Sequence, residues 1–251
     1  MVDPLRFETN AEDYSRARPP YPAALWERIG ELGLLRPGHR AIDLGAGTGQ
    51  ATGPLLRAGL HVSAVEPGPR LAAQLRATHA GADVLLARAE DLDERGLQDG
   101  SFDLAVAATS LHWMDLDIVL PTVRRLLMPG GTFLVWRNVF GDPTRPTPFR
   151  EQVTAIVRER DAPRRPGPDP EDVDATVAAL TRAGLFTAEE VNRYRWSVEL
   201  DEQQVHRLFT TFSDWSAAEV ERAVDAVRDL GGIVLEHYQS WLVVLSPTSS
   251  V

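Results

Sequence analysis

The sequence predicts a single α/β domain built on a doubly wound, mostly parallel sheet, and three observations support this fold class. Short apolar runs of strand length alternate five times with stretches of helical periodicity. The first of these runs ends at Leu44 and leads into a turn with glycines at alternate positions, which allow a tight change of direction. The chain has 251 residues, of which 43% are hydrophobic and 25% are charged, so it can bury the sizeable core of such a sheet.

The predicted elements begin with a helix in which Leu25, Ile29 and Leu32 recur at helical spacing. Gly33 and the following Pro-Gly pair end this helix. Apolar runs then predict strands at 41–44, 60–65, 83–87, 101–108 and 132–136, and helical patterns predict helices at 51–58, 70–76 and 118–127. This alternation predicts parallel strands joined by helices on both faces of the sheet.

The regular alternation ends after residue 136, but no second domain is predicted within residues 1–251. Residues 137–170 are rich in proline and arginine and are interpreted as a partly helical insertion beside the site. A helix at 173–180 and a sixth strand at 191–200 follow. Residues 201–232 are interpreted as a second, helical insertion near the substrate site, and apolar runs at 233–236 and 239–245 predict a last strand. Residues 1–20 are polar, end in Pro19-Pro20 and are interpreted as an N-terminal arm.

The turn after the first strand carries the strongest functional signal. Asp43 precedes Gly45, Gly47 and Gly49, and Glu66 ends the next strand, 66 − 45 = 21 positions after the first glycine. Open α/β sheets bind ligands at the carboxyl ends of their strands, where an acid can accept hydrogen bonds from two ribose hydroxyls. A dinucleotide fingerprint would need a glycine at the position of Gln50, so this spacing disfavours a dinucleotide.

The pattern Asp-x-Gly-x-Gly-x-Gly at residues 43–49 resembles the first motif of the class I S-adenosylmethionine-dependent methyltransferases. The Phe-Asp pair at 102–103 and the Leu-Met-Pro-Gly-Gly turn at 127–131 are similar to later segments of that family. The run from Tyr14 through Arg18-Pro-Pro-Tyr21-Pro resembles the signature of its trans-aconitate-methyltransferase-like branch. The resemblance implies a Rossmann-like sheet with a seventh, antiparallel strand, S-adenosylmethionine as cofactor and S-adenosylhomocysteine as product.

The resemblance also implies which residues bind the cofactor. Tyr14 and Arg18 are expected near its methionine carboxylate, and Ala89 and Glu90 near its adenine, although the family commonly has an aspartate where this chain has Arg88. The full set of expected cofactor residues is Tyr14, Arg18, Asp43, Gly45, Gly47, Gly49, Glu66, Ala89, Glu90, Ala107 and Ala108.

The segment after the fourth strand is expected to meet the methyl acceptor. His112 is the candidate catalytic residue there, because an imidazole titrates near neutral pH and can deprotonate or orient an acceptor. Trp113 is the candidate substrate contact. The alternative is that His112 and Trp113 only form a wall of the cofactor pocket. The arginines at 145–165 form either an anion site for a carboxylate acceptor or a solvated surface.

Three functions stay open from the sequence. The first is transfer of a methyl group from S-adenosylmethionine to a small-molecule acceptor, with O-methylation favoured over N- and C-methylation. The second keeps the cofactor as a structural group for a non-methylating reaction such as cyclisation. The third is a binding or partner subunit that keeps the fold without catalysis. The identity of the acceptor and the oligomeric state have no signal in the sequence.

Composition excludes several other classes. A net charge of −10 opposes nucleic-acid binding, and no apolar span or basic amphipathic helix suggests a membrane. The chain has no cysteine and no lysine, which excludes disulfides, thiolate metal sites and Schiff-base chemistry. The histidines show no metal-binding spacing, so no metal is expected. The lack of cysteine and of a signal-peptide pattern at the N-terminus predicts a cytoplasmic protein.

Overall fold

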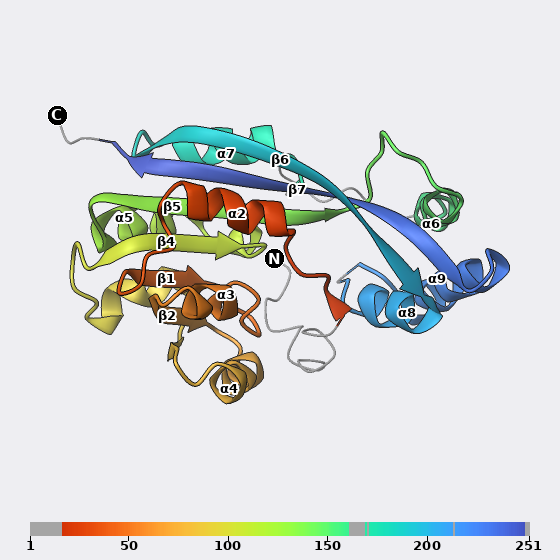
Figure 1. Ribbon diagram of the computed structural model, residues 1–251, viewed down its shortest axis with the longest axis horizontal. Coiled ribbons are helices and arrows are strands. Elements are labelled where there is room, and N and C mark those ends of the chain that lie inside the picture. The colour runs from red at the N-terminus through yellow and green to blue at the C-terminus, as the bar shows by residue number, and fades with distance from the viewer. Residues whose placement is uncertain (1–16, 161–168, 170, 213, 249–251) are drawn as a thin grey trace.

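One seven-stranded sheet, in the order β3-β2-β1-β4-β5-β7-β6, forms the centre of the computed structural model (Figure 1). The structure describes residues 17–160, 169, 171–212 and 214–248. The strands are β1 (Arg40–Leu44), β2 (His61–Glu66), β3 (Asp83–Leu86), β4 (Phe102–Ala108), β5 (Leu127–Phe140), β6 (Phe186–Asp201) and β7 (Ile233–Pro247). The strands β1 to β5 pair in parallel, and β7 lies antiparallel between β5 and β6. The predicted seven-stranded, mostly parallel α/β sheet is confirmed.

Helices cover both faces of this sheet, as a doubly wound fold requires. Successive residues of a strand point to opposite faces, and in β5 this places Trp136 in a core with α2 and α3 but Val135 in a core with α5 and α7. The helices are α2 (Ala23–Glu31), α3 (Thr52–Arg57), α4 (Pro69–Thr78), α5 (Leu116–Leu126), α6 (Pro148–Arg158), α7 (Val173–Thr181), α8 (Glu202–Thr210) and α9 (Ala217–Asp229), with short 3₁₀ helices η2 (Ala89–Arg95) and η3 (Leu111–Trp113).

The parallel register brings the carboxyl ends of the inner strands to one edge. Asp43 of β1 lies opposite Ala64 of β2 and Val106 of β4. The residues that follow these strands therefore emerge beside one another, although they are separated by 22 to 64 positions in the chain. This edge is called the carboxyl edge below.

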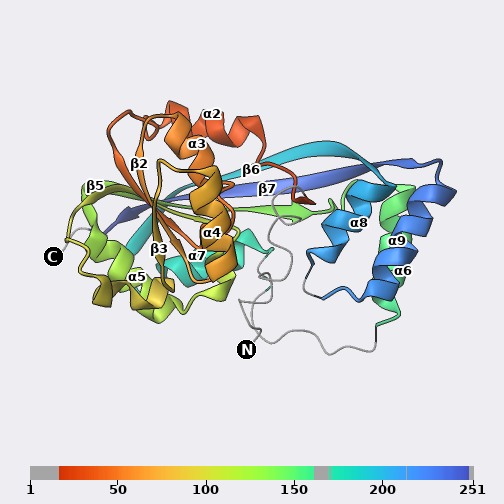
Figure 2. The ribbon, with the colours of Figure 1, turned by 90° about the horizontal axis from the view of Figure 1, so that it is seen from below.

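Three strands continue well past the carboxyl edge. Trp136 is the last residue of β5 that pairs with β4, but β5 goes on pairing with β7 as far as Phe140. The continuations of β6 and β7, residues 193–201 and 233–241, form a two-stranded ribbon, and residues 137–140 of β5 join it as a third strand only next to the sheet. A helical cap of α6, α8 and α9 lies at the far end of the ribbon, away from β1, β2 and β3 (Figure 2). The cap has an apolar core of its own, which includes Phe149, Phe209 and Val227.

The ends of several elements differ from those predicted. The strand β5 includes residues 137–140, the first four of the predicted insertion, because antiparallel pairing with β7 supplies hydrogen-bond partners there. Within 201–232, α8 and α9 form as predicted. Both begin with a capping box, in which Asp201 pairs with Gln204 and Ser216 with Glu219.

No helix among the described residues is long and apolar enough to span a membrane.

Candidate functional site

Each of the three glycines in the loop after β1 is required for a different structural reason. All three have positive φ angles, of +67° at Gly45, +59° at Gly47 and +96° at Gly49, a region that other residues avoid. A β-carbon at Gly45 would lie 2.6 Å from the β-carbon of Ser110, and one at Gly49 would overlap the His79 ring and lie 2.6 Å from Leu75. A β-carbon at Gly47 would meet nothing within 4 Å among the described residues. Gly47 is therefore the glycine whose backbone faces open space.

Glu66 joins the tip of β2 to this loop. Its carboxylate is buried, and its Oε2 accepts a hydrogen bond of 2.8 Å from the backbone N–H of Gly47. Its Oε1 accepts another of 2.8 Å from the N–H of Gly68. The predicted ribose-binding acid is thus placed directly beside the open glycine.

Asp43 lies beneath the loop with no exposed surface. Its Oδ2 accepts a hydrogen bond of 2.6 Å from the Thr52 hydroxyl, while Oδ1 has no hydrogen-bond partner among the described residues. Burial raises the pKa of Asp43 from 3.8 to about 7, against the opposing effect of the Thr52 hydrogen bond, and the nearby Glu66 carboxylate raises it further. The site therefore holds a carboxyl group that titrates near neutral pH.

We expect Asp43→Asn to stabilise the protein by roughly 2–4 kcal/mol at pH 8 and to have little effect near pH 4. The folded-state pKa lies above the ordinary value, so folding takes up a proton between about pH 4 and pH 7, and this group lowers the free energy of unfolding as pH rises through that window. Urea denaturation of both proteins at several pH values measures the effect. Equal pH dependence in the two proteins would show that Asp43 carries no such penalty. Asp117→Asn, at an exposed carboxylate, is the matched control.

The tip of β4 holds a strained residue that the sequence did not single out. Ala107 is buried and Ala108 half-buried, and the next residue, Thr109, has a φ angle of +60° although it is not glycine. Its hydroxyl lies 3.0 Å from the hydroxyl of Tyr21, which stabilises this conformation. The Ser110 hydroxyl donates a hydrogen bond of 2.6 Å to the carbonyl of Leu44 and so links the ends of β1 and β4. Strain of this kind concentrates at functional sites.

The predicted adenine-binding pair lies at the start of η2, after β3. Ala89 is buried. The Glu90 carboxylate forms an ion pair of 3.3 Å with Arg88 and accepts a hydrogen bond of 2.9 Å from the backbone N–H of Asp115. Burial raises the pKa of Glu90, but the hydrogen bonds from Arg88 and Asp115 outweigh burial and bring the pKa below its ordinary value. Arg88, the departure from the family pattern, is thus the ion-pair partner of Glu90.

His112 and Trp113 lie in η3, directly after the β4 tip. Their rings are 4.6 Å apart between centroids, with His112 exposed and Trp113 half-buried. Nδ1 of His112 is 3.0 Å from Nη1 of Arg137, the first residue of β5 beyond the carboxyl edge. A guanidinium can only donate, so Nδ1 is the acceptor, and a neutral ring carries its proton on Nε2. Sequence reasoning missed Arg137, because spacing alone does not place residue 137 beside residue 112.

Arg18 links the glycine loop to the helical cap. Its carbonyl accepts a hydrogen bond of 3.2 Å from the Gln50 side chain. Its guanidinium donates a hydrogen bond of 3.1 Å to the carbonyl of Thr211 and lies 4.6 Å from the centre of the Phe212 ring. Tyr14, its predicted companion, lies outside the described residues. The predicted cofactor residues from Asp43 to Glu66 thus meet at one point of the carboxyl edge, with Ala107, Ala108, Ala89 and Glu90 at neighbouring strand ends.

Two of the described arginines between residues 145 and 160 take part in separate ion pairs. Arg150 pairs with Glu236 at 2.8 Å, and Arg160 pairs with Asp214 at 2.8 Å and with Glu219 at 2.6 Å. Arg164 and Arg165 lie outside the described residues. The described residues contain no cluster of three or more acidic or histidine side chains that could hold a metal ion.

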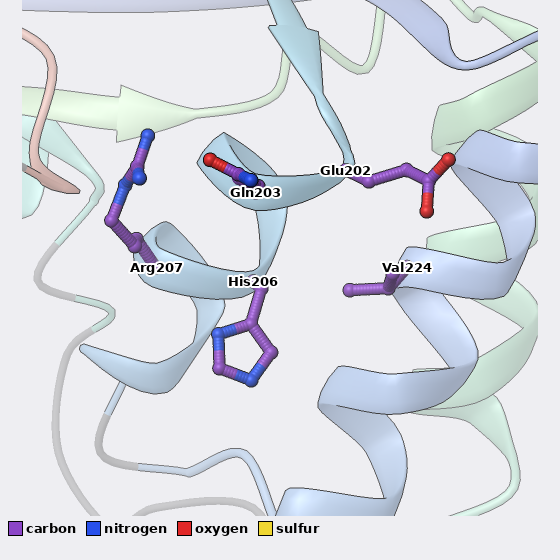
Figure 3. Close-up of a pocket in the computed structure, with 5 residues that line it drawn as sticks. All are labelled: Glu202, Gln203, His206, Arg207 and Val224. Atoms are coloured by element: carbon purple, nitrogen blue, oxygen red, sulfur yellow. The ribbon is translucent and has the colours of Figure 1, made fainter.

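A surface depression lies between α8 and α9 (Figure 3), helices that lie at the other end of the molecule from β1 and β2 (Figure 1). It is lined by Glu202, Gln203, His206, Arg207 and Val224. Glu202 pairs with Arg228 at 2.9 Å and His206 with Glu221 at 3.5 Å, so two of its polar side chains already have partners. Its place on the cap makes it no part of the candidate site.

Comparison with known proteins finds similarity to methyltransferases. Residues 42–135 match the family model described as a methyltransferase domain. An uncharacterized methyltransferase of Mycobacterium tuberculosis is 41% identical over 135 residues, 53% of each chain. A methyltransferase-like protein of Schizosaccharomyces pombe, also uncharacterized, is 31% identical over 167 residues, 65% of this chain and 62% of its own. The chain thus spans about half the length of the first of these relatives.

Solved structures extend the likeness to the whole fold. A putative type II methyltransferase from Anaeromyxobacter dehalogenans is 26% identical with a TM-score of 0.62, covering 91% of this chain and 96% of its own. Geranyl diphosphate methyltransferase, solved with geranyl diphosphate and sinefungin, is 19% identical with a TM-score of 0.51, covering 90% of this chain and 78% of its own. The sequence over residues 42–135 and the fold over nearly the whole chain are those that methyltransferases share.

Proposed function

We propose that this protein transfers a methyl group from S-adenosylmethionine to a small-molecule acceptor. The observation that carries the proposal is the pairing of an open glycine backbone at Gly47 with the buried carboxylate of Glu66 at the tip of the next strand. A nucleoside can lie against bare backbone there while an acid accepts hydrogen bonds from its ribose. The match of residues 42–135 to a methyltransferase domain supports the same ligand.

The residues fit this cofactor in three respects. Gly47 leaves room that a side chain would fill, and Glu66 is the acid for the ribose hydroxyls. Asp43 holds the loop from below through Thr52 and has a buried oxygen without a partner among the described residues. The backbone N–H of Ala89 and the side chain of Glu90 are assigned to the adenine, and the backbone at Ala107 and Ala108 to the methionine end.

S-adenosylmethionine, when bound, supplies an activated methyl group whose leaving group is a neutral thioether. The main task of the protein is then to hold the acceptor in line and to exclude water. We assign His112 to this positioning. The guanidinium of Arg137 donates a hydrogen bond to Nδ1 of His112, so the neutral ring carries its proton on Nε2. This Nε2–H donates a hydrogen bond to an oxygen of the acceptor and orients it. Trp113 supplies a flat surface next to the ring.

The proposal also includes narrower assignments of the methylated atom and of the family branch. The Nε2–H of His112 orients an acceptor oxygen but takes up no proton, so the favoured reaction is methylation of an oxygen that is already ionised. Membership of the trans-aconitate-methyltransferase-like branch rests on the Tyr14-to-Tyr21 signature, of which Arg18 joins the glycine loop to the cap. Geranyl diphosphate is a ligand of the methyltransferase that was solved with it and does not identify the acceptor of this protein.

Calorimetric titration with S-adenosylmethionine, S-adenosylhomocysteine and NAD tests the cofactor. We expect the first two to bind and NAD not to bind, and we expect Glu66→Ala to weaken binding by a factor of about 100 or more, because it removes a charge-assisted contact and frees Gly47. Asp117→Asn, at an exposed carboxylate, serves as the control. Binding of NAD instead, or unchanged affinity in Glu66→Ala, would refute the assignment.

Release of S-adenosylhomocysteine in an acceptor screen then tests the reaction. His112→Ala should still bind the cofactor but lose most turnover, whereas normal turnover would reduce His112 to a wall of the pocket.

A further inference from the structure

Tyr238 of β7 has a buried hydroxyl that the fold does not use. The residue is 3% exposed, and its Oη has no hydrogen-bond partner among the described residues. Buried polar groups are nearly always hydrogen-bonded, and each exception calls for an explanation. A phenylalanine at this position would pack equally well without leaving a hydroxyl unsatisfied. The hydroxyl therefore either lowers the stability of the protein without a function or forms a hydrogen bond with a bound ligand.

Two aromatic rings pack against the Tyr238 ring, and a third packs against one of these two. Phe140 and Trp196 are the cross-strand neighbours of Tyr238 on β5 and β6. The Trp196 ring stacks on Tyr238 with centroids 4.6 Å apart, and the Phe140 ring lies 5.3 Å from both Tyr238 and Phe212. Phe140, Phe212 and Trp196 are each only half-buried. These four residues, called the aromatic cluster below, thus combine accessible ring surface with one polar atom that lacks a partner among the residues described.

Contacts through Arg18 connect the aromatic cluster with the glycine loop. The side chain of Gln50, in the loop, donates to the Arg18 carbonyl, and the Arg18 guanidinium lies against Phe212 of the cluster. On the same ribbon face, Asn138 donates to the carbonyls of Pro19 and Pro20. Arg18 therefore contacts both the glycine loop and the aromatic cluster.

Burial keeps the Tyr238 hydroxyl in its neutral form, against the effect of the arginines around the cluster. Guanidinium groups lie against two of the rings, Arg18 at Phe212 and Arg150 at Phe140, the latter 4.1 Å from the ring centre. Burial raises the pKa of Tyr238 above its ordinary value, although both arginines act to lower it. The hydroxyl can therefore donate to or accept from an oxygen at any physiological pH.

We propose that the aromatic cluster is the acceptor subsite and that Tyr238 is a specificity-determining residue, whose hydroxyl binds an oxygen of a flat, largely apolar methyl acceptor. This inference rests on the proposed function and deepens it by naming the class of substrate. The rings of Trp196, Phe140 and Phe212 hold the apolar body, as flat aromatic surfaces do. The Tyr238 hydroxyl rejects analogues that lack the oxygen, because it would otherwise stay unpaired in the complex.

Tyr194 provides a matched control on the same strand and face as Trp196. It lies two residues before Trp196 in β6, and its hydroxyl also lacks a partner among the described residues. It packs with the core cluster of α2 and α3 and not with the aromatic cluster. Tyr194→Phe therefore removes an equivalent hydroxyl outside the proposed subsite.

The experiment uses two fluorinated probes, 4-fluorophenol and 4-fluorotoluene, in which a hydroxyl and a methyl group occupy the same ring position, and follows their ¹⁹F NMR signals with the protein of residues 1–251. We expect 4-fluorophenol to bind wild type more tightly than 4-fluorotoluene, and Tyr238→Phe to weaken 4-fluorophenol about five- to tenfold, to the level of 4-fluorotoluene. Tyr194→Phe should change neither. Tyr238→Phe should keep or raise the melting temperature, because it removes an unsatisfied hydroxyl.

Several results would overturn the proposal. The first is that neither probe binds wild type, and the second is that 4-fluorophenol binds wild type and Tyr238→Phe equally. The third is a lower melting temperature for Tyr238→Phe than for wild type, which would show that the hydroxyl has a structural partner. The probes are titrated without the cofactor, and S-adenosylmethionine is titrated separately into each protein. Failure of wild type to bind the cofactor would refute the proposed function, whereas the probe data judge the subsite alone.

Discussion

Gly49→Ala is expected to lower the free energy of unfolding by about 3 kcal/mol, whereas Gly47→Ala is expected to lower it by only about 1 kcal/mol and to weaken S-adenosylmethionine binding tenfold or more. Both substitutions place a side chain at a positive φ angle. Only at Gly49 does the new methyl group also run into packed side chains, those of His79 and Leu75. At Gly47 it projects into the open space assigned to the nucleoside.

Urea denaturation and calorimetric titration of the same two proteins separate the effects. Gly38→Ala is the control, because Gly38 has a φ angle of +85°, faces open space among the described residues and lies outside the glycine loop. It should cost about as much stability as Gly47→Ala and leave cofactor affinity unchanged. Equal cofactor affinity in Gly47→Ala and wild type would mean that the nucleoside does not lie against Gly47.

Arg150→Met is the second substitution with a large expected effect, a loss of about 3 kcal/mol of stability. Arg150 of α6 pairs with Glu236 of β7, whose side chain is 1% exposed. Burial raises the pKa of Glu236 although the Arg150 guanidinium acts to lower it, so the pair holds an acid in a place that disfavours its charge. Removing the cation leaves this carboxylate buried without compensation.

A double-mutant cycle in urea measures this pair. The double variant Arg150→Met/Glu236→Leu should recover much of the stability lost in Arg150→Met, because it removes both charges from the apolar surroundings. The control is Arg182→Met, which breaks an ion pair with Asp117 in which both side chains are largely exposed, and which should cost less than about 1 kcal/mol. A loss in Arg150→Met no larger than in Arg182→Met would contradict the assigned role.

The sequence was sufficient for those features that depend on local pattern. Strands and helices up to residue 136 follow from apolar periodicity, and their order follows from the alternation of the two. The placement of Asp43, the glycines and Glu66 at one edge follows from parallel pairing, which needs only the positions of the strand ends. The roles of these residues in binding remain predictions.

Features that depend on long-range pairing were beyond the sequence. The contact of Arg137 with His112 requires the register of β5 against β4, which no local pattern reports. The strain at Thr109 carries no residue signature, because a glycine would normally mark a positive φ angle. The different reasons for Gly45, Gly47 and Gly49 became visible only from what surrounds each one.

The ribbon of β5, β6 and β7 has a consequence for how the separation between the glycine loop and the cap can change. Beyond Phe140 the ribbon consists of β6 and β7 alone, and the number of residues in these two strands sets its length, at about 3.3 Å each. A residue inserted in only one of the two strands is absorbed as a bulge and leaves the ribbon almost as long as before. A longer separation requires matched insertions in both strands, which are separated in the chain by α8 and α9. The spacing between the two halves of the molecule is therefore resistant to single insertions and deletions, and variation in length is confined to the loops at either end.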